Sequence, residues 1–423
     1  MDVRKLALEA INKITQNSAY SNVVVNETLS KFEMSKEDRA FFTNLVYGTI
    51  QNLITIEFYL EPYINGKKTK PWIKNLLNMS VYQLLFLDIP EYAILDEAVE
   101  IAKIKDHHIG GFVNGVLRNF LRNGLRTFDT LDEIEKLSIK YSMPIWLVSY
   151  LMKDYPINIV ERILQESVLV KKDAIRVNTL KTTKEEVCKL LDEEKIGYAD
   201  SSFVSNGLII DESVIGTQMF KKGLITVQDL ASQKVAEVVN PLEGSMVLDL
   251  CSAPGGKTAH MASIMNNTGT IHACDVHQHK MKLMEKNFKK LGVTNCKTQL
   301  ISALEISKHV KEESFDYIIA DVPCSGLGVI GHKVDLKYHI DLKSIEEIKK
   351  IQKDILNSTC NLVKVGGYYT YSTCTINSEE NGLQIREFLE KHPNFEIAYE
   401  ETILPFEHDS DGFYICKMRR CDE

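Results

Sequence analysis

Two cysteines in this chain stand where a thiol could take part in chemistry. Cys324 follows a proline in a turn after the apolar run FDYIIAD, and Cys374 ends the apolar run YYTYST. A cysteine inside a helical run, such as Cys188, is expected to pack as a small apolar side chain. Cysteines at strand ends beside an acid, here Asp321, are instead candidates for a thiolate nucleophile and its partner.

The loop after the run MVLDLC is a second candidate site, and it reads Cys251-Ser252-Ala253-Pro254-Gly255-Gly256-Lys257-Thr258. A Walker A loop would need Gly five positions before Gly256, where this chain has Cys251, and a dinucleotide fingerprint would need G-x-G-x-x-G. The loop therefore favours neither an NTPase nor a dehydrogenase. Asp275 follows Gly255 at the spacing from which a carboxylate reaches a ribose hydroxyl, so we expect a nucleoside ligand. A structural turn followed by a solvated Asp is the alternative.

The elements that carry these loops alternate between strand and helix after Pro241. The short apolar runs are MVLDLC, TIHACD, FDYIIAD and GGYYTYST, and stretches with helical period separate them. This alternation predicts an α/β, Rossmann-like domain with a doubly wound and mostly parallel sheet. Ligands bind outside the carboxyl ends of strands in such sheets, so we expect all four loops to share one rim.

The rest of the chain divides by the period of its apolar residues. Residues 1–126 repeat apolar side chains three and four apart, which predicts an all-α domain. Residues 127–172 form a helical connector that Pro144 and Pro156 break into pieces. Residues 173–240 mix strand-like runs with amphipathic helices and predict a small α+β domain, and residues 241–423 form the α/β domain.

Composition limits the class of protein. The 423 residues are 44% hydrophobic and 26% charged, with formal net charge −8, so binding to nucleic acid would have to use local patches. No apolar stretch reaches the roughly 18 residues of a spanning helix, and we expect a cytoplasmic protein without a membrane partner. The nine cysteines include no C-x-x-C pair, so we expect reduced thiols and no metal site.

The three catalytic-domain motifs together resemble the RsmB/NOP/NSUN family of S-adenosylmethionine-dependent RNA 5-methylcytosine methyltransferases; they read DLCSAPGGKT, ADVPCSGLGVIG and YSTCTINSEEN. Upstream, GGFVNGVLRNFLRN and VYQLLFLDIPEYAILDEAVEIAK resemble the NusB-like helical RNA-binding domain of bacterial members. The segments AIRVNTLKTTKEEVCKLL and GLITVQDLASQ resemble the family's small RNA-recognition domain. The resemblance therefore covers nearly the whole chain.

The resemblance implies a role for each matching residue. S-adenosylmethionine would be the cofactor, with its methionine side in the loop Cys251 to Lys257 and its ribose on Asp275. Cys374 would be the nucleophile and Cys324 the second thiol, which helps to release product. Asp321 would border both cofactor and base. The family's acid near the adenine is replaced here by Ser302, whose hydroxyl can still form a hydrogen bond.

The chemistry gives a reason for two thiols. Cytosine C5 is a poor nucleophile, but a thiolate that adds at C6 makes an enamine whose C5 can attack a sulfonium methyl group. Asp321, if it carries or shares a proton, could hydrogen-bond N3 and stabilise the charge that develops on the ring. The adduct must then lose its C5 proton, and Cys324 or water activated near it could be the base. The target base must also leave its stack.

Three hypotheses follow. The first is methylation of one cytidine in small-subunit (16S) ribosomal RNA by a monomer. The second is the same chemistry on transfer RNA, which the catalytic motifs do not distinguish and only the NusB-like domain disfavours. The third is a non-catalytic RNA-binding assembly factor with a vestigial cofactor fold, against which the intact Cys374, Cys324 and Asp321 argue.

The basic residues do not by themselves identify the RNA-binding surface. Arg118 and Arg122 lie four apart with Arg126 beyond them, and a solvated face explains them as well as phosphate binding does. The lysine-rich helix expected after Asp275 is better explained as an exposed helix face, and its lysines are Lys280, Lys282, Lys286, Lys289 and Lys290. The family's two arginines and Lys-Pro-Asp after GLGVI are replaced by residues 331–335, which read GHKVD, so a local RNA contact is weaker or moved.

Overall fold

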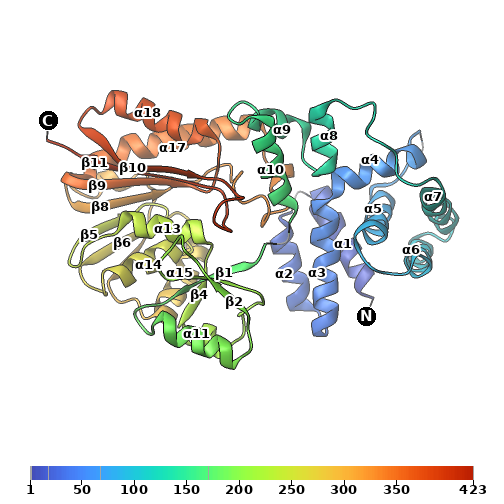
Figure 1. The fold of residues 1–423 in the computed structure, drawn as a ribbon, viewed down its shortest axis with the longest axis horizontal. Coiled ribbons are helices and arrows are strands. Elements are labelled where there is room, and N and C mark those ends of the chain that lie inside the picture. The colour runs from blue at the N-terminus through green and yellow to red at the C-terminus, as the bar shows by residue number, and fades with distance from the viewer. Residues whose placement is uncertain (1, 18, 67, 170, 423) are drawn as a thin grey trace. The chain divides into compact units, whose positions relative to one another are not determined.

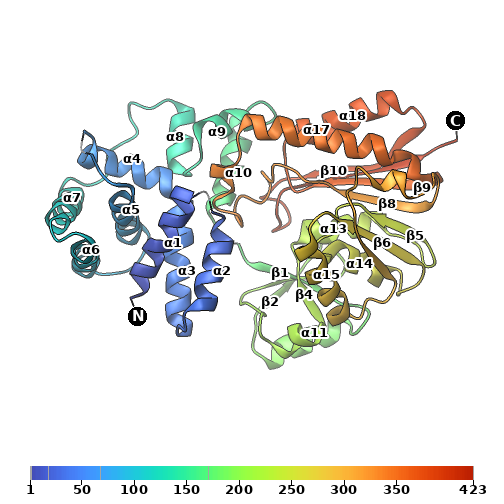
Figure 2. The same ribbon diagram turned by 180° about the vertical axis from the view of Figure 1, so that it is seen from behind.

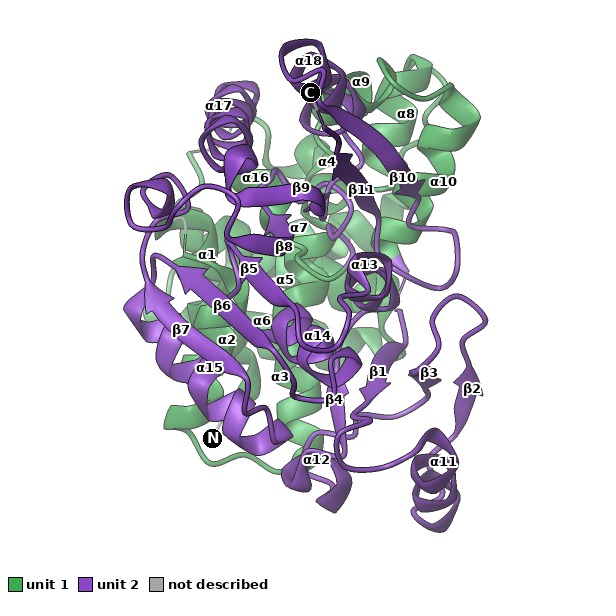
Figure 3. Cartoon of the chain, turned by 90° about the vertical axis from the view of Figure 1, so that its left-hand side faces the viewer, with its two compact units in different colours: residues 1–168, 332–339 green, residues 169–331, 340–423 purple. Residues whose placement is uncertain are grey.

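The structure, a computed structural model, describes residues 2–17, 19–66, 68–169 and 171–422. The chain forms two compact units, coloured separately in Figure 3. The helical unit contains residues 1–168 and 332–339, and the sheet unit contains residues 169–331 and 340–423. The finer four-part division proposed from the sequence stays a prediction.

Among its described residues the helical unit contains helices and no strands, which confirms the predicted all-α N-terminal domain (Figure 1). They are α1 (Val3–Asn17), α2 (Ser21–Lys31), α3 (Lys36–Gln51), α4 (Leu53–Ile64), α5 (Pro71–Phe86), α6 (Glu91–Lys105), α7 (Ile109–Asn123), α8 (Glu133–Lys140), α9 (Ile145–Leu151), α10 (Ile157–Val168) and α16 (Leu336–His339). Within the ranges that the structure describes, no helix has the length and apolar character needed to cross a membrane.

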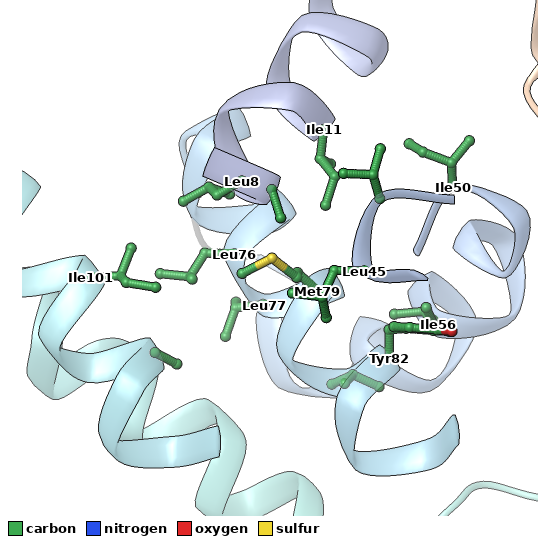
Figure 4. Packing of buried hydrophobic residues seen from close by; sticks show 14 of the residues in the cluster. Leu8, Ile11, Leu45, Ile50, Ile56, Leu76, Leu77, Met79, Tyr82 and Ile101 are labelled. Carbon is green, nitrogen blue, oxygen red and sulfur yellow. The ribbon is translucent and has the colours of Figure 1, made fainter. Parts of the chain in front are cut away.

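One apolar core holds the helical unit together. Leu8 of α1, Leu45 of α3 and Leu76 of α5 are fully buried against one another's helices (Figure 4). Burying a leucine side chain contributes about 2 kcal/mol. This cluster of more than twenty buried side chains therefore dominates the stability of the unit. The two predicted breaks are present, because α9 begins after Pro144 and α10 begins after Pro156.

A short segment from late in the sequence, residues 332–339, packs within the helical unit. The Asp335 carboxylate accepts hydrogen bonds from Ser21 Oγ and Ser21 N, both at 2.7 Å. The Lys337 ammonium is buried and donates to the carbonyl oxygens of Gln51 at 2.7 Å and Ser142 at 2.5 Å. The altered GHKVD stretch therefore supplies structural contacts to the helices.

The first part of the sheet unit is a four-stranded antiparallel sheet in the order β2-β3-β1-β4, which confirms the predicted small α+β domain. Its elements are β1 (Asp173–Val177), α11 (Lys184–Glu193), β2 (Tyr198–Asp200), β3 (Gly207–Ile210), α12 (Gln218–Lys222) and β4 (Ile225–Val227). Thr183 and Glu186 form a capping box that starts α11, since each side chain bonds the other's backbone N–H.

The second part is a seven-stranded sheet in the order β10-β11-β9-β8-β5-β6-β7. Its strands are β5 (Met246–Asp249), β6 (Thr270–Asp275), β7 (Cys296–Leu300), β8 (Phe315–Asp321), β9 (Val363–Thr373), β10 (Phe395–Ile403) and β11 (Phe413–Arg420). β5 to β9 pair in parallel, as predicted, while β10 and β11 add an antiparallel edge that the sequence analysis did not foresee.

Helices cover both faces of this sheet. Its helices are α13 (Leu230–Val239), α14 (Gly256–Ile264), α15 (Gln278–Leu291), α17 (Leu342–Thr359) and α18 (Gly382–Lys391). α17 and α18 lie on one face and α13, α14 and α15 on the other (Figure 2). The chain reverses direction along the sheet at β5, which lies between β6 and β8. Such a switch point is where a doubly wound sheet opens a crevice for a ligand.

Candidate active site

The carboxyl ends of β5, β6, β8 and β9 bring the predicted loops to one edge of the sheet. β6 ends at Asp275, β8 ends at Asp321, and β9 ends at Thr373, one residue before Cys374. Register supports this placement, because Asp321 lies opposite Ser372 in the ladder between β8 and β9. The sequence-predicted convergence of these loops is therefore present in the fold.

The two candidate thiols are in contact. Cys324 Sγ and Cys374 Sγ lie 3.3 Å apart. The hydrogen bond between these sulfurs, together with burial, raises the pKa of the Cys324 thiol well above its ordinary value. Cys324 therefore keeps its proton at neutral pH and can donate it to the sulfur of Cys374. A thiol that receives such a donor is more easily present as a thiolate, the nucleophilic form.

Asp321 is held by a cation and a hydroxyl beside the thiols. Lys257 Nζ donates to Asp321 Oδ2 at 2.8 Å, and Ser372 Oγ donates to Asp321 Oδ1, also at 2.8 Å. Burial alone would lower the pKa of the Lys257 ammonium, but the Asp321 carboxylate outweighs it and holds the pKa above its ordinary value. Lys257 is therefore a charged donor at the site, placed to share a proton through Asp321.

Lys257 belongs to a tight turn that links β5 to α14. Gly255 adopts φ +94°, in the left-handed region, and a Cβ there would lie 2.6 Å from Met284 Cγ. Only glycine fits this position without strain. Ser252 Oγ and Ser252 N both bond the carbonyl oxygen of Cys274 at 2.9 Å, which fastens the turn to β6. Gly256 and Lys257 then open α14, so backbone N–H groups face the edge of the sheet.

The thiol of Cys251, in the loop after β5, has a packing role, unlike the Cys324 and Cys374 thiols. Burial raises the pKa of Cys251, and its side chain packs against the apolar core of the sheet. Cys251 is thus a neutral packing residue whose backbone belongs to the loop. Cys188 likewise packs with an apolar cluster, as expected from its helical setting, and Cys360 is buried in the core of the large sheet.

Asp275 is nearly buried and ties the loop to the next turn. Its Oδ2 accepts from Ala253 N at 3.3 Å, and its Oδ1 accepts from His277 N at 2.9 Å and lies 3.0 Å from His277 Nδ1. Ser302 lies just beyond β7, next to the strand that ends at Asp275, and its Oγ accepts from Leu304 N at 3.2 Å. Among the described residues, no group of three His, Cys, Asp or Glu side chains could hold a metal ion.

Two polar residues at this edge were missed by sequence reasoning. Ser372 orients Asp321, and Asp249, at the end of β5, accepts from Thr258 Oγ1 at 2.7 Å. Burial raises the pKa of Asp249 to about 7 despite that hydrogen bond. The sequence signal for Asp249 was an acid at the end of an otherwise apolar strand. An unpaired charge at such a buried place is costly, so an acid there is a candidate for a functional residue.

The basic patches have mixed surroundings. Arg118 and Arg122 are exposed on α7, whereas Arg126 pairs with Glu61 at 2.8 Å and stacks on the Phe58 ring. α15 turns most of its lysines to solvent, as expected of an exposed face. The RNA-binding role of either patch stays a prediction.

Comparisons with family models match the chain in three stretches. The model described as 16S rRNA methyltransferase RsmB/F matches residues 236–419, and the NusB family model matches residues 1–122. A ferredoxin-like domain model of the RsmF/B-like methyltransferases matches residues 143–215. The three stretches leave residues 123–142 and 216–235 unmatched.

Curated relatives match over nearly their full length. The probable ribosomal RNA small subunit methyltransferase B of Bacillus subtilis is 38% identical over 99% of this chain and 98% of its own length. The corresponding probable enzyme of Synechocystis is 30% identical over 99% of this chain and 100% of its own length. The ribosomal RNA small subunit methyltransferase B of Proteus mirabilis is 29% identical over 99% of both chains.

Solved structures share the fold. The crystal structure of PH0851 superposes with a TM-score of 0.84 at 27% identity, covering 99% of each chain. NSun6 from Pyrococcus horikoshii, solved with SFG, gives a TM-score of 0.61 at 22% identity and covers 66% of this chain and 99% of its own. The latter likeness shows a shared fold over that share of the chain.

Proposed function

The chain belongs to the RsmB/F methyltransferase family, and we propose that it methylates C5 of one cytidine in small-subunit (16S) ribosomal RNA through a covalent Cys374 adduct. The observation that carries this proposal is the contact of Cys374 with Cys324, 3.3 Å between sulfurs, at the edge where Lys257 and Asp321 pair. This combination offers a nucleophile, a protonated thiol and a proton-sharing acid around one space. The names of the full-length relatives support small-subunit ribosomal RNA as the substrate.

S-adenosylmethionine fits the donor set on the other side of that space. The Asp275 carboxylate suits a ribose diol, the backbone of residues 251–257 suits the methionine carboxylate and amine, and Ser302 suits a nearby polar edge. When bound there, the cofactor supplies a methyl group on a positively charged sulfur. The chain's own residues must then activate the acceptor base, because cytosine C5 does not attack such a methyl unaided.

Addition of the nucleophile is the first task of the chain. The Cys374 thiolate forms a bond to C6, and the ring electrons move toward N3, which takes a proton from the Asp321–Lys257 pair. Lys257 keeps this pair supplied, since its ammonium donates directly to Asp321 Oδ2. C5 then carries the nucleophilic electron pair and can accept the methyl group.

Release of the product is the second task. A base removes the C5 proton, the C5–C6 double bond forms again, and the bond from C6 to the Cys374 sulfur breaks. Cys324 or a water molecule beside it would take that proton. As the bond from C6 to sulfur breaks, the Cys324 thiol, which holds its proton at neutral pH, passes that proton to the departing Cys374 sulfur. Cys324 thereby becomes the thiolate that can take the C5 proton, and N3 returns its proton to the Asp321–Lys257 pair. Without Cys324, the adduct should persist.

The test is transfer of tritiated methyl groups to unmodified small-subunit ribosomal RNA. The wild type is expected to label the RNA, and Cys374→Ala is expected to abolish labelling, because the neighbouring Cys324 thiol keeps its proton at neutral pH and does not replace the nucleophile. Cys324→Ala is expected to accumulate a protein–RNA adduct seen as a slow band on a denaturing gel. Cys188→Ala, which changes a cysteine of the small sheet's core, serves as the matched control.

The outcomes separate the alternatives. Labelling of transfer RNA in preference to ribosomal RNA would favour the second substrate. RNA binding without cofactor binding by calorimetry would favour an assembly factor with a vestigial site. Adduct accumulation in Cys374→Ala instead of Cys324→Ala would reverse the two thiol roles.

A further inference from the structure

Two consecutive side chains behind the thiol pair have no part in the chemistry above. Glu380 closes a short 3-10 turn, Ser378–Glu380, and Asn381 precedes α18. Glu380 is 0% exposed and Asn381 is 2% exposed. Charged and amide side chains are rarely buried to this degree without extensive hydrogen bonding, so the partners of both residues indicate what they do.

Glu380 is held by four hydrogen-bond donors and, among the ion pairs of the described residues, by no cation. Its Oε2 accepts from Ser325 N and from Gln352 Nε2, both at 2.9 Å. Its Oε1 accepts from Asn377 Nδ2 at 3.0 Å and from Ser325 Oγ. Both carboxylate oxygens are thus fully used by neutral donors.

These donors fix the backbone on both sides of Cys324. Ser325, the next residue, is bound to Glu380 through its backbone and its side chain. On the other side, Gln352 Nε2 donates to Pro323 O at 2.8 Å while it also donates to Glu380. Glu380 therefore anchors the peptide groups that flank the protonated thiol.

Asn381 does the same for Cys374. Its Nδ2 donates to the carbonyl oxygen of Thr375 at 2.9 Å, and its Oδ1 accepts from Thr373 Oγ1 at 2.6 Å. Thr373 and Thr375 are the two neighbours of Cys374 in the chain, and both are fully buried. Asn381 therefore anchors the two residues that flank the nucleophile, Thr375 through its peptide carbonyl and Thr373 through its side chain.

The two anchors are joined. Ser325 Oγ lies 2.8 Å from Thr375 Oγ1, which connects the residue after Cys324 with the residue after Cys374. Tyr371 OH donates to the backbone carbonyl of Glu380 at 2.7 Å, which fixes the anchor to β9. A network of this kind is rigid because every member has its partners.

We propose that Glu380 and Asn381 are positioning residues that set the separation of the two sulfurs, Glu380 through the Cys324 loop and Asn381 through the Cys374 loop. The proposal deepens the proposed methyltransfer function and rests on it for its kinetic consequences. The two thiols act in different steps at neighbouring ring atoms, so an error of about 1 Å in their separation is enough to slow the reaction greatly. The distance between the two sulfurs can be tested whether or not the protein methylates RNA.

The direction of the hydrogen bonds makes the carboxylate necessary. Gln352 cannot turn its amide over to help Glu380→Gln, because its Oε1 already accepts from Gln384 Nε2 at 3.1 Å. Asn377 cannot either, because its Oδ1 accepts from Glu379 N at 3.0 Å. Only the Ser325 hydroxyl is free to reverse. Glu380→Gln therefore places an amide N–H₂ group against at least one donor that cannot change.

The first test measures the sulfur separation without RNA. Phenylarsine oxide binds two close thiols: two As–S bonds form, the thiols give up their protons and the oxide oxygen leaves as water. Wild type is expected to take one arsenical across Cys324 and Cys374, located by mass spectrometry and absent in Cys324→Ala. Glu380→Gln is expected to bind it at least about tenfold more weakly, the cost of a buried donor left unpaired.

The second test separates the two reaction steps. Glu380→Gln is expected to slow resolution of the protein–RNA adduct by about tenfold or more, and Asn381→Asp is expected to slow adduct formation by a similar factor. Calorimetric affinity for S-adenosylmethionine should stay within about twofold of wild type, because none of these contacts involves the residues that suit the cofactor. A general loss of folding would change all three quantities together.

Glu379→Gln is the matched control, since Glu379 is the preceding residue and its carboxylate pairs with the Lys349 ammonium at 2.6 Å. It should behave as wild type in both tests. Ser325→Ala, which removes one donor and leaves the backbone bond, is the second variant if Glu380→Gln unfolds, and a several-fold loss of arsenical affinity is expected. Unchanged arsenical affinity in Glu380→Gln, or in Ser325→Ala, overturns the proposal. Wild type that binds the arsenical but labels no RNA would instead reject the proposed function.

Discussion

The buried carboxyl of Asp249 makes the stability of the sheet unit depend on pH in a calculable way. Burial raises its pKa from 3.8 to about 7. A carboxyl whose pKa is raised in the folded state contributes stability that is complete below the unfolded pKa and is lost as the pH rises through the folded pKa. Between pH 4 and pH 7 the folded chain holds a proton that the unfolded chain has released. The unfolding free energy therefore falls by about 1.4 kcal/mol for each pH unit in that window.

The perturbation is Asp249→Asn, which keeps the shape and an acceptor for Thr258 Oγ1 but cannot ionise. From pH 5 to pH 8 the wild type should lose about 3 kcal/mol relative to this variant. The assay is hydrogen exchange under rising urea, measured by mass spectrometry on peptides from β5 and α14. Tryptophan fluorescence is the internal control, because Trp72 and Trp146 both lie in helices of the helical unit. If the unfolding free energies of the wild type and of Asp249→Asn change in parallel across this pH range, the reasoning is refuted.

Three more predictions follow from the site and the helical unit. Lys257→Met should lower the rate of methyl transfer about 10²- to 10³-fold, because Asp321 loses its charged donor, while Lys286→Met on exposed α15 should not; single-turnover kinetics decides this. Hydrogen peroxide should be reduced to water as Cys324 and Cys374 are oxidised to a disulfide, with activity lost and then restored by dithiothreitol; mass mapping that finds both thiols still reduced after inactivation would contradict this. Burial lowers the pKa of Lys337 to about 7, so the unfolded chain binds more protons above that pH and stability should rise by about 3 kcal/mol between pH 7 and pH 9.5 relative to Lys337→Met, as measured by tryptophan fluorescence in urea.

Much of this architecture could be predicted from local pattern. The apolar runs before Cys251, Asp275, Asp321 and Cys374 are buried parallel strands. Because the carboxyl ends of parallel strands lie at the same edge of a sheet, the loops that follow them could be placed together from the sequence. The breaks at prolines were equally local, because proline cannot continue a preceding helix. The roles of the placed residues remain predictions until variants are measured.

The rest depends on partners far apart in the sequence. Ser325 and Glu380 are 55 residues apart, and Ser21 and Asp335 are 314 apart, so no window of sequence could relate them. The antiparallel edge was missed for another reason. β10 is largely exposed and polar, with only Phe395 and Ile403 buried, so it lacks the apolar run that marks the inner strands.

The packing of residues 332–339 against α2 and α3 means that the helical unit is not a continuous piece of the gene. A fragment that stops at residue 168 would leave Ser21 without its carboxylate partner and the carbonyls of Gln51 and Ser142 without their ammonium donor. Such a fragment should melt earlier than the same helices in the whole protein, and a synthetic peptide spanning these eight residues should raise its melting temperature by mass action. Dissection of the protein into independently folding halves must therefore carry this octapeptide with the helices, by circular permutation or by a short graft.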